Sequence, residues 1–124
     1  MAGSVPNVPA DASFGYLFAG VAVADLAAEV DWFSRLFGRP PDILPNADEA
    51  MWTAAASGSV YLVRRPDRAG NAHVTLAVAD LDRWIAELAG RGIEPLRTET
   101  VPAGRKLVLA DPEGNEINLA EVPR

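Results

Sequence analysis

One short sequence occurs twice in this chain, and the repeat constrains the fold more tightly than any single motif. Val21-Ala-Val-Ala-Asp-Leu26 returns 55 residues later as Leu76-Ala-Val-Ala-Asp-Leu81, each time after a strand-like run and before a helix-like one. A second match aligns the glycine of Gly58-Ser-Val-Tyr-Leu-Val63 with that of Gly114-Asn-Glu-Ile-Asn-Leu119. Such an internal repeat indicates two copies of one supersecondary unit.

The first predicted unit spans about residues 16–65. Tyr16 to Val23 is a short apolar run typical of a buried strand. Asp25 then occupies the position of a helix N-cap, and Gly38 with the following prolines ends that helix. Residues 43–65 contain short strands separated by turn residues, and a polar linker over 64–71 follows.

The second predicted unit spans about residues 72–121 and repeats this order. His73 to Val78 reads as a strand, and Asp80 is the matching N-cap. A strand is expected over Ile93–Val101 after the helix. Two final strands, over 106–110 and 116–121, flank a turn rich in Asp, Pro, Gly and Asn. The sequence therefore predicts an α+β fold of two βαβββ units.

Length and charge narrow the class of protein. With 124 residues, 49% of them hydrophobic, the chain has material for one core, predicted over residues 14–124 behind an N-terminal arm at 1–13. Eleven basic and 17 acidic residues give a formal charge of -6. This charge disfavours nucleic-acid binding, which needs phosphate-neutralising groups, and favours a cationic ligand.

Two further features set the expected chemistry and location. The chain contains no cysteine, which excludes disulfides, thiolate metal sites and cysteine nucleophiles. Residues 1–11 have neither a basic start nor a long apolar stretch, so we predict no signal peptide and no membrane anchor. A cytoplasmic protein without membrane or nucleic-acid partners is expected.

Several motifs together resemble the vicinal oxygen chelate superfamily, which includes glyoxalase I, extradiol dioxygenases, fosfomycin-modifying enzymes and bleomycin-resistance proteins. They are the repeated unit, the Val-x-Asp-Leu helix entry, the helix exit at Trp32-Phe33 and Leu36-Phe37-Gly38, and the closing Asp111-Pro-Glu-Gly-Asn-Glu-Ile-Asn-Leu119. The similarity covers about residues 16–121. It implies that each unit curls its sheet into half a barrel around a cavity, often completed by a second subunit, so a homodimer is expected.

The resemblance also implies where a metal would be held. In metal-using members the ligands come from the first and last strands of both units, which places them at His73 and Asn118. The repeat assigns the twin positions to Phe18 and Leu62. Because a catalytic metal needs about three protein ligands and His73 alone is a good donor, we predict no metal and no cofactor.

The altered positions indicate a cavity suited to apolar or aromatic ligands. Strand alternation places Thr75 on the face of His73 and Glu116 on the face of Asn118. Trp52 is a candidate stacking surface, whereas Tyr61 is expected beneath the helices because it alternates away from Leu62. The predicted ligand-contacting residues are Phe18, Trp52, Val60, Leu62, His73, Thr75, Glu116 and Asn118.

Three functions remain open from the sequence. The first is a metal-free binding protein, similar to bleomycin-resistance proteins, that sequesters an antibiotic or a bulky metabolite. The second is an enzyme of the same fold, in which His73 and Glu116 either hold a metal as unusual ligands or act as acid and base without one. The third is a non-catalytic regulatory or partner-binding module. His73, the chain's single histidine, can equally be a former ligand position that now serves as a polar group in a strand.

Overall fold

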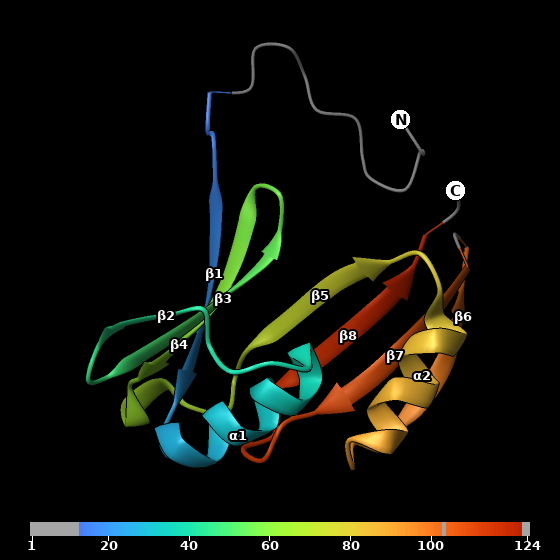
Figure 1. The fold of residues 1–124 in the computed structure, drawn as a ribbon. Helices are drawn as coiled ribbons and strands as arrows, with labels where there is room; N and C mark the ends of the chain where they lie inside the picture. The colour runs from blue at the N-terminus through green and yellow to red at the C-terminus, as the bar shows by residue number, and fades with distance from the viewer. Residues whose placement is uncertain (1–12, 103, 123–124) are drawn as a thin grey trace.

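The computed structural model describes residues 13–102 and 104–122, so most of the predicted N-terminal arm lies outside the described part (Figure 1). The first unit forms a four-stranded sheet, here called sheet A. Its strands, in spatial order, are β1 (Leu17–Val23), β4 (Gly58–Arg64), β3 (Glu49–Ala55) and β2 (Ile43–Asn46).

The second unit forms an equivalent four-stranded sheet, here called sheet B. In spatial order it contains β5 (His73–Val78), β8 (Glu116–Glu121), β7 (Gly104–Ala110) and β6 (Arg97–Val101). In both sheets the first strand of the unit pairs in parallel with the last, and the other pairs are antiparallel. The predicted α+β fold of two βαβββ units is confirmed.

The two α-helices begin where the sequence predicts. The Asp25 carboxylate accepts a hydrogen bond from Ala28 N at 3.0 Å and caps α1 (Leu26–Phe37). Gly38 ends α1 in the left-handed region, with φ of 73°. Asp80 caps α2 (Leu81–Gly90) in the same way. Neither of these helices in the described part is long and apolar enough to cross a membrane.

One strand is shorter than predicted. β6 begins at Arg97, so the expectation of a strand from Ile93 is wrong for its first four residues. Gly92 turns the chain with a φ of 79°, and Ile93 is buried in the core next to it. Pro95 has no N–H to donate to a sheet. The chain therefore joins the sheet after the proline, where Leu96 N donates to Val108 O at 2.8 Å.

The helices cover one side of each sheet, and a single core joins the two units. Figure 1 shows α1 below sheet A and α2 beside sheet B. The two helices meet at their C-terminal ends, where Arg91 donates to Leu36 O and Arg35 to Gly92 O. We call the side of each sheet that faces away from the helices its open face. The core includes Val21, Phe33, Leu36, Trp52 and Leu62 from the first unit, and Leu81, Leu88, Leu107, Leu109, Ile117 and Leu119 from the second.

The closing turn of the second unit is fastened to the first unit. The Glu113 carboxylate accepts hydrogen bonds from Ala24 N and Asp25 N, each at 2.8 Å, at the start of α1. Asp111 holds the turn in shape by accepting from Asn115 N at 2.8 Å and from Asn115 Nδ2 at 2.7 Å. A carboxylate at a helix N-terminus is favourable because it meets unpaired N–H groups and the positive end of the helix dipole.

We expect Glu113→Ala to lower the free energy of unfolding by about 1 to 2 kcal/mol, because charge-assisted bonds to two backbone N–H groups are lost. Glu113→Gln should cost less, since one amide oxygen can still accept. Urea denaturation of both variants measures the difference. Unchanged stability of the alanine variant would show that the turn does not hold the units together.

Candidate binding site on the open faces

Strand pairing shows which residues of the two units are equivalent. In sheet A, Gly20 lies opposite Tyr61. In sheet B, Thr75 lies opposite Asn118. The structural twin of Asn118 is therefore Tyr61, and the predicted equivalence with Leu62 is wrong by one residue.

The error comes from aligning the repeat on its glycines. Gly58 is the first residue of β4, whereas Gly114 lies in the turn, two residues before β8 begins. Because side chains alternate along a strand, a slip of one residue moves every side chain to the other face.

The slip accounts for the misplacement of Leu62 and Tyr61 in β4, and Trp52 in β3 was misplaced independently of it. Trp52 and Leu62 are buried in the core on the helix side, so the prediction that they line the cavity is wrong. Val60 is also nearly buried, but it lines a small hollow that Thr75 lines as well. Trp52 stacks on Phe37 with ring centroids 5.4 Å apart, and its Nε1 donates to Arg39 O at 3.1 Å. Tyr61, expected beneath the helices, lies instead on the open face.

Aromatic side chains occupy the open face of sheet A. Phe18 is 56% exposed, and its ring centroid lies 4.7 Å from that of Tyr16. The Tyr16 hydroxyl is 2.6 Å from Ser59 Oγ, which fixes this ring pair to β4. A hollow of about 360 Å³ separates Phe18 from Tyr61 and is also lined by Pro45, Glu49 and Met51. This surface offers rings and a thioether to a ligand.

Gly20 is the signal that identifies Tyr61 as part of this surface. A Cβ atom at position 20 would lie 2.7 Å from both Cζ and Oη of Tyr61, so any side chain there would force the tyrosine ring to move. A glycine inside a strand often marks such a close approach. The glycine therefore lets the tyrosine ring lie directly against β1.

Polar side chains occupy the open face of sheet B, and the structure brings together the four that the sequence singled out there. Asn118 Nδ2 donates to Glu116 Oε2 at 2.9 Å and lies 3.1 Å from His73 Nε2. It also lies 3.5 Å from Thr75 Oγ1. His73 Nε2 and Glu116 Oε2 are 3.4 Å apart.

The Glu116 carboxylate fixes the orientation of the Asn118 amide. A carboxylate accepts hydrogen bonds, so the amide must turn its NH₂ group toward Glu116. The amide oxygen then points away from His73 and is buried without a hydrogen-bond partner. The hydrogen bond from Asn118 lowers the pKa of Glu116, and the charges of Lys106 and Arg97 contribute to the same shift. Glu116 is thus held as an anion.

Basic groups balance the carboxylates on this face. Lys106 Nζ lies 3.5 Å from Glu99 Oε1, and Arg97 pairs with the other oxygen of the same carboxylate. The hydrogen bond from Arg97 lowers the pKa of Glu99. The open face of sheet B is therefore not strongly acidic, although the whole chain has a net charge of -6. It gives no preference for a cationic ligand.

The described residues do not fit a chelated metal. Asn118 presents its amide nitrogen, which is not a metal ligand, to the space between His73 and Glu116. In the first unit the two equivalent positions hold Phe18, which is a hydrocarbon, and Tyr61, whose ring lies against Gly20. No group of three or more His, Asp or Glu side chains in the described ranges is placed to hold a metal ion.

The fold and these surfaces define a class of protein: two βαβββ units whose open faces offer rings from one sheet and hydrogen-bonding groups from the other. The family described as glyoxalase-like domain matches residues 19–120. The chain belongs to that family, and so to the vicinal oxygen chelate superfamily that the sequence resembled.

Solved structures give a consistent picture. A glyoxalase/bleomycin resistance protein from Catenulispora acidiphila is 42% identical, with a TM-score of 0.82 over 87% of this chain and 98% of that one. TnmS3, an antibiotic binding protein from Streptomyces sp. CB03234, is 26% identical, with a TM-score of 0.73 over 90% and 98%.

A lactoylglutathione lyase from Agrobacterium tumefaciens is 17% identical over 91% of this chain and 96% of that one, with a TM-score of 0.71, and shows the fold alone. No curated protein sequence matches this chain.

Proposed function

We propose that this protein binds a small molecule with an aromatic or apolar part on the open face of sheet A and does not transform it. The observation that carries the proposal is the aromatic surface of Phe18, Tyr16 and Tyr61, in which Phe18 and Tyr61 are the counterparts of His73 and Asn118 in the second unit. Flat aromatic surfaces stabilise ring-containing ligands through stacking. The similarity to an antibiotic binding protein supports a bulky metabolite or antibiotic as the ligand.

In this proposal, the open face of sheet B supplies the polar contacts. Thr75 and His73 can each donate to or accept from a ligand, and the anionic Glu116 can accept. A few placed polar groups beside an apolar surface are typical of small-molecule sites. They orient a ligand whose rings lie on the other sheet.

The chemistry of the His73 and Glu116 pair favours binding over acid-base catalysis. A catalytic base works best with a pKa near the working pH, whereas the hydrogen bond from Asn118 moves the pKa of Glu116 downward, away from neutrality. No described cysteine is available as a nucleophile. Glu116 therefore serves better as a fixed polar contact than as a base.

N-phenylnaphthylamine, a neutral aromatic dye that fluoresces when it leaves water, tests the aromatic surface. We expect the wild-type protein to bind it and Tyr61→Ala to weaken binding roughly five- to tenfold, the loss expected for one aromatic pair. Fluorescence titration measures the dissociation constant.

Trp84→Ala is the matched control. Trp84 lies in α2 and lines a separate apolar groove of about 310 Å³ that also includes Phe37, Leu76 and Leu119. This variant removes a ring of similar kind without touching the open face. If Trp84→Ala weakened dye binding and Tyr61→Ala did not, the dye would bind in the groove, and the proposal would be wrong.

Native mass spectrometry of protein purified from its source tests the rest of the proposal. We expect no tightly held metal and an unmodified co-purified small molecule. One Zn, Fe, Mn or Ni ion per subunit would contradict the proposal that the protein binds its ligand without a metal. Turnover of the bound metabolite that disappears in His73→Ala while binding survives would establish the enzyme instead.

We also propose that two copies associate. The exposed apolar residues Leu17 and Leu44 are each 70% accessible, and they lie on the two opposite edge strands of sheet A. A second copy would cover such edges and enclose the open faces. Sedimentation should therefore give a dimer that Leu44→Glu weakens; a wild-type monomer at high concentration would contradict this.

A further inference from the structure

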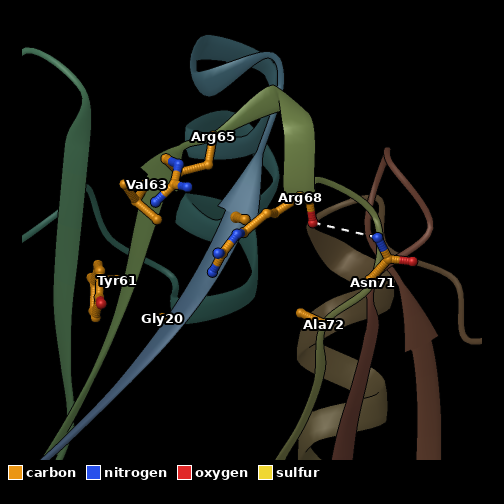
Figure 2. A pocket seen from close by; sticks show the side chains of 8 residues that line it. Gly20, Tyr61, Val63, Arg65, Arg68, Asn71 and Ala72 are labelled. Atoms are coloured by element: carbon orange, nitrogen blue, oxygen red, sulfur yellow. Dashed lines mark hydrogen bonds between the residues drawn. The ribbon is translucent and has the colours of Figure 1, made fainter.

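A second hollow lies on the open face of sheet A, at the end where the chain leaves β4 for the second unit (Figure 2). It has a volume of about 330 Å³. Its lining combines strand residues with linker residues: Gly20, Ala22, Tyr61, Val63, Arg65, Arg68, Asn71 and Ala72.

The strand side of this hollow is flat and apolar. Tyr61 lines both this hollow and the one beside Phe18. Gly20 has no side chain to project from β1 beside Tyr61. A Cβ atom there would lie 2.7 Å from Cζ and Oη of Tyr61. Ala22, with its small side chain, lines the same hollow on the way to the linker.

The linker side carries two guanidinium groups. Arg65 precedes the short 3₁₀ helix η1 (Pro66–Arg68), and Arg68 is its last residue. Figure 2 shows both side chains extending over the strands. Their backbone is fixed: Arg65 N donates to Val23 O at 2.9 Å, and Arg68 N donates to Arg65 O at 2.9 Å. Asn71 Nδ2 donates to Ala69 O at 3.1 Å and closes the turn.

The charged residues that line this hollow are both basic, despite the acidic chain. Within the described residues, Asp67 is the one carboxylate in ion-pair range of either guanidinium, at 3.5 Å from Arg65 Nη2. The hydrogen bond from Arg65, together with the charge of Arg68, lowers the pKa of Asp67. One carboxylate facing two guanidinium groups leaves a cation free to meet an anion.

We propose that the hollow selects an aromatic anion, whose ring lies against Tyr61 while its oxyanion group is bound by Arg65 and Arg68. Guanidinium groups suit planar oxyanions such as carboxylate and sulfonate because they donate several N–H groups in one plane. The inference rests on the proposed function, since the ring position is the aromatic surface of sheet A. It replaces the cationic ligand expected from net charge with an anionic one.

The test compares two dyes that share a ring system. Anilinonaphthalene sulfonate carries one negative charge, and N-phenylnaphthylamine is its neutral counterpart. We expect the wild-type protein to bind the sulfonate roughly tenfold more tightly than the neutral dye, as for one charge-assisted contact at a partly exposed site. Raising the salt concentration to about 0.5 M should remove most of this preference.

Arginine variants locate the contact. Arg65→Ala and Arg68→Ala should bring the affinity for the sulfonate close to that for the neutral dye, while the neutral dye binds as before. Arg64→Ala is the matched control, because it removes the same charge from the adjacent residue. Arg64 Nε already pairs with Asp48 Oδ1 at 3.0 Å, and Arg64 does not line the hollow. Its sulfonate affinity should change by less than about twofold.

The outcomes separate this inference from the proposed function. Equal binding of both dyes, weakened by Tyr61→Ala and unaffected by Arg65→Ala or Arg68→Ala, would overturn the anion site and leave the aromatic surface standing. A loss of sulfonate binding as large in Arg64→Ala as in Arg68→Ala would reduce the effect to net charge and overturn it too. Failure of both dyes to bind would overturn both proposals.

Discussion

Glu29→Gln should remove much of the loss of stability that the wild-type protein suffers as the pH rises from 4.5 toward 9. Glu29 lies in α1, is fully buried, and neither carboxyl oxygen has a hydrogen-bond partner in the described residues. Burial raises the pKa of Glu29 from 4.5 to about 9, and the neighbouring Asp111 carboxylate adds to the increase. Folded Glu29 therefore keeps its proton at neutral pH.

The sign of the effect follows from proton binding. Below pH 4.5, Glu29 is protonated in both the folded and the unfolded chain, and its full contribution to stability is present. Above that pH the unfolded chain releases the proton while the folded protein holds it. The free energy of unfolding then falls by up to about 1.4 kcal/mol per pH unit until the pH passes the folded pKa.

Urea denaturation at a series of pH values measures this effect. Between pH 5 and pH 8, the stability of Glu29→Gln relative to the wild type should rise by at most about 4 kcal/mol. Glu94→Gln is the control, because Glu94 is exposed and the chemical change is the same. Its curve should run parallel to that of the wild type. A parallel curve for Glu29→Gln would show that this carboxyl ionises without penalty in the folded protein.

Leu62→Ala and Tyr61→Ala, which alter adjacent residues of β4, should have opposite consequences. Leu62 is fully buried, so its truncation removes apolar contacts and leaves a cavity that costs about 2 to 5 kcal/mol. Tyr61 lies on the open face, and its truncation should cost about 1 kcal/mol or less. Ligand binding should show the reverse order.

Urea denaturation and dye titration of both variants decide the strand register. If Tyr61→Ala destabilised the protein as much as Leu62→Ala, the open face would not be open. If Leu62→Ala weakened dye binding at temperatures where the variant is folded, the register expected from the glycine alignment would be correct.

Local features of the fold could be predicted because they depend on neighbouring residues. Asp25, Asp80 and Gly38 cap their helices through contacts within a few residues, so spacing in the sequence suffices. The shorter β6 was not foreseen, because the strand pattern from Ile93 omits the docking of that residue in the core. Burial in the core is a property of the assembled units.

The polar half of the site could be predicted, and the aromatic half could not. Side chains alternate along β5 and β8 from the residues expected, which places four polar groups on one face: His73, Thr75, Glu116 and Asn118. In β4 the starting residue depends on the turn, and the shorter turn of the first unit shifts the register by one. Gly20 indicates a close approach of another group to β1, but the sequence does not show that this group is the Tyr61 ring of the neighbouring strand.

The repeat by itself determined the architecture, because two βαβββ units and their capped helices follow from spacing along the chain. The motifs of the chain resemble the family that the match over residues 19–120 shows. The tertiary structure decided which face each strand presents, and so exchanged Leu62 for Tyr61 in the candidate site. It also decided that Glu29 is buried against the turn of the other unit. Pairing register and contacts between units join residues far apart in sequence, so no local pattern records them.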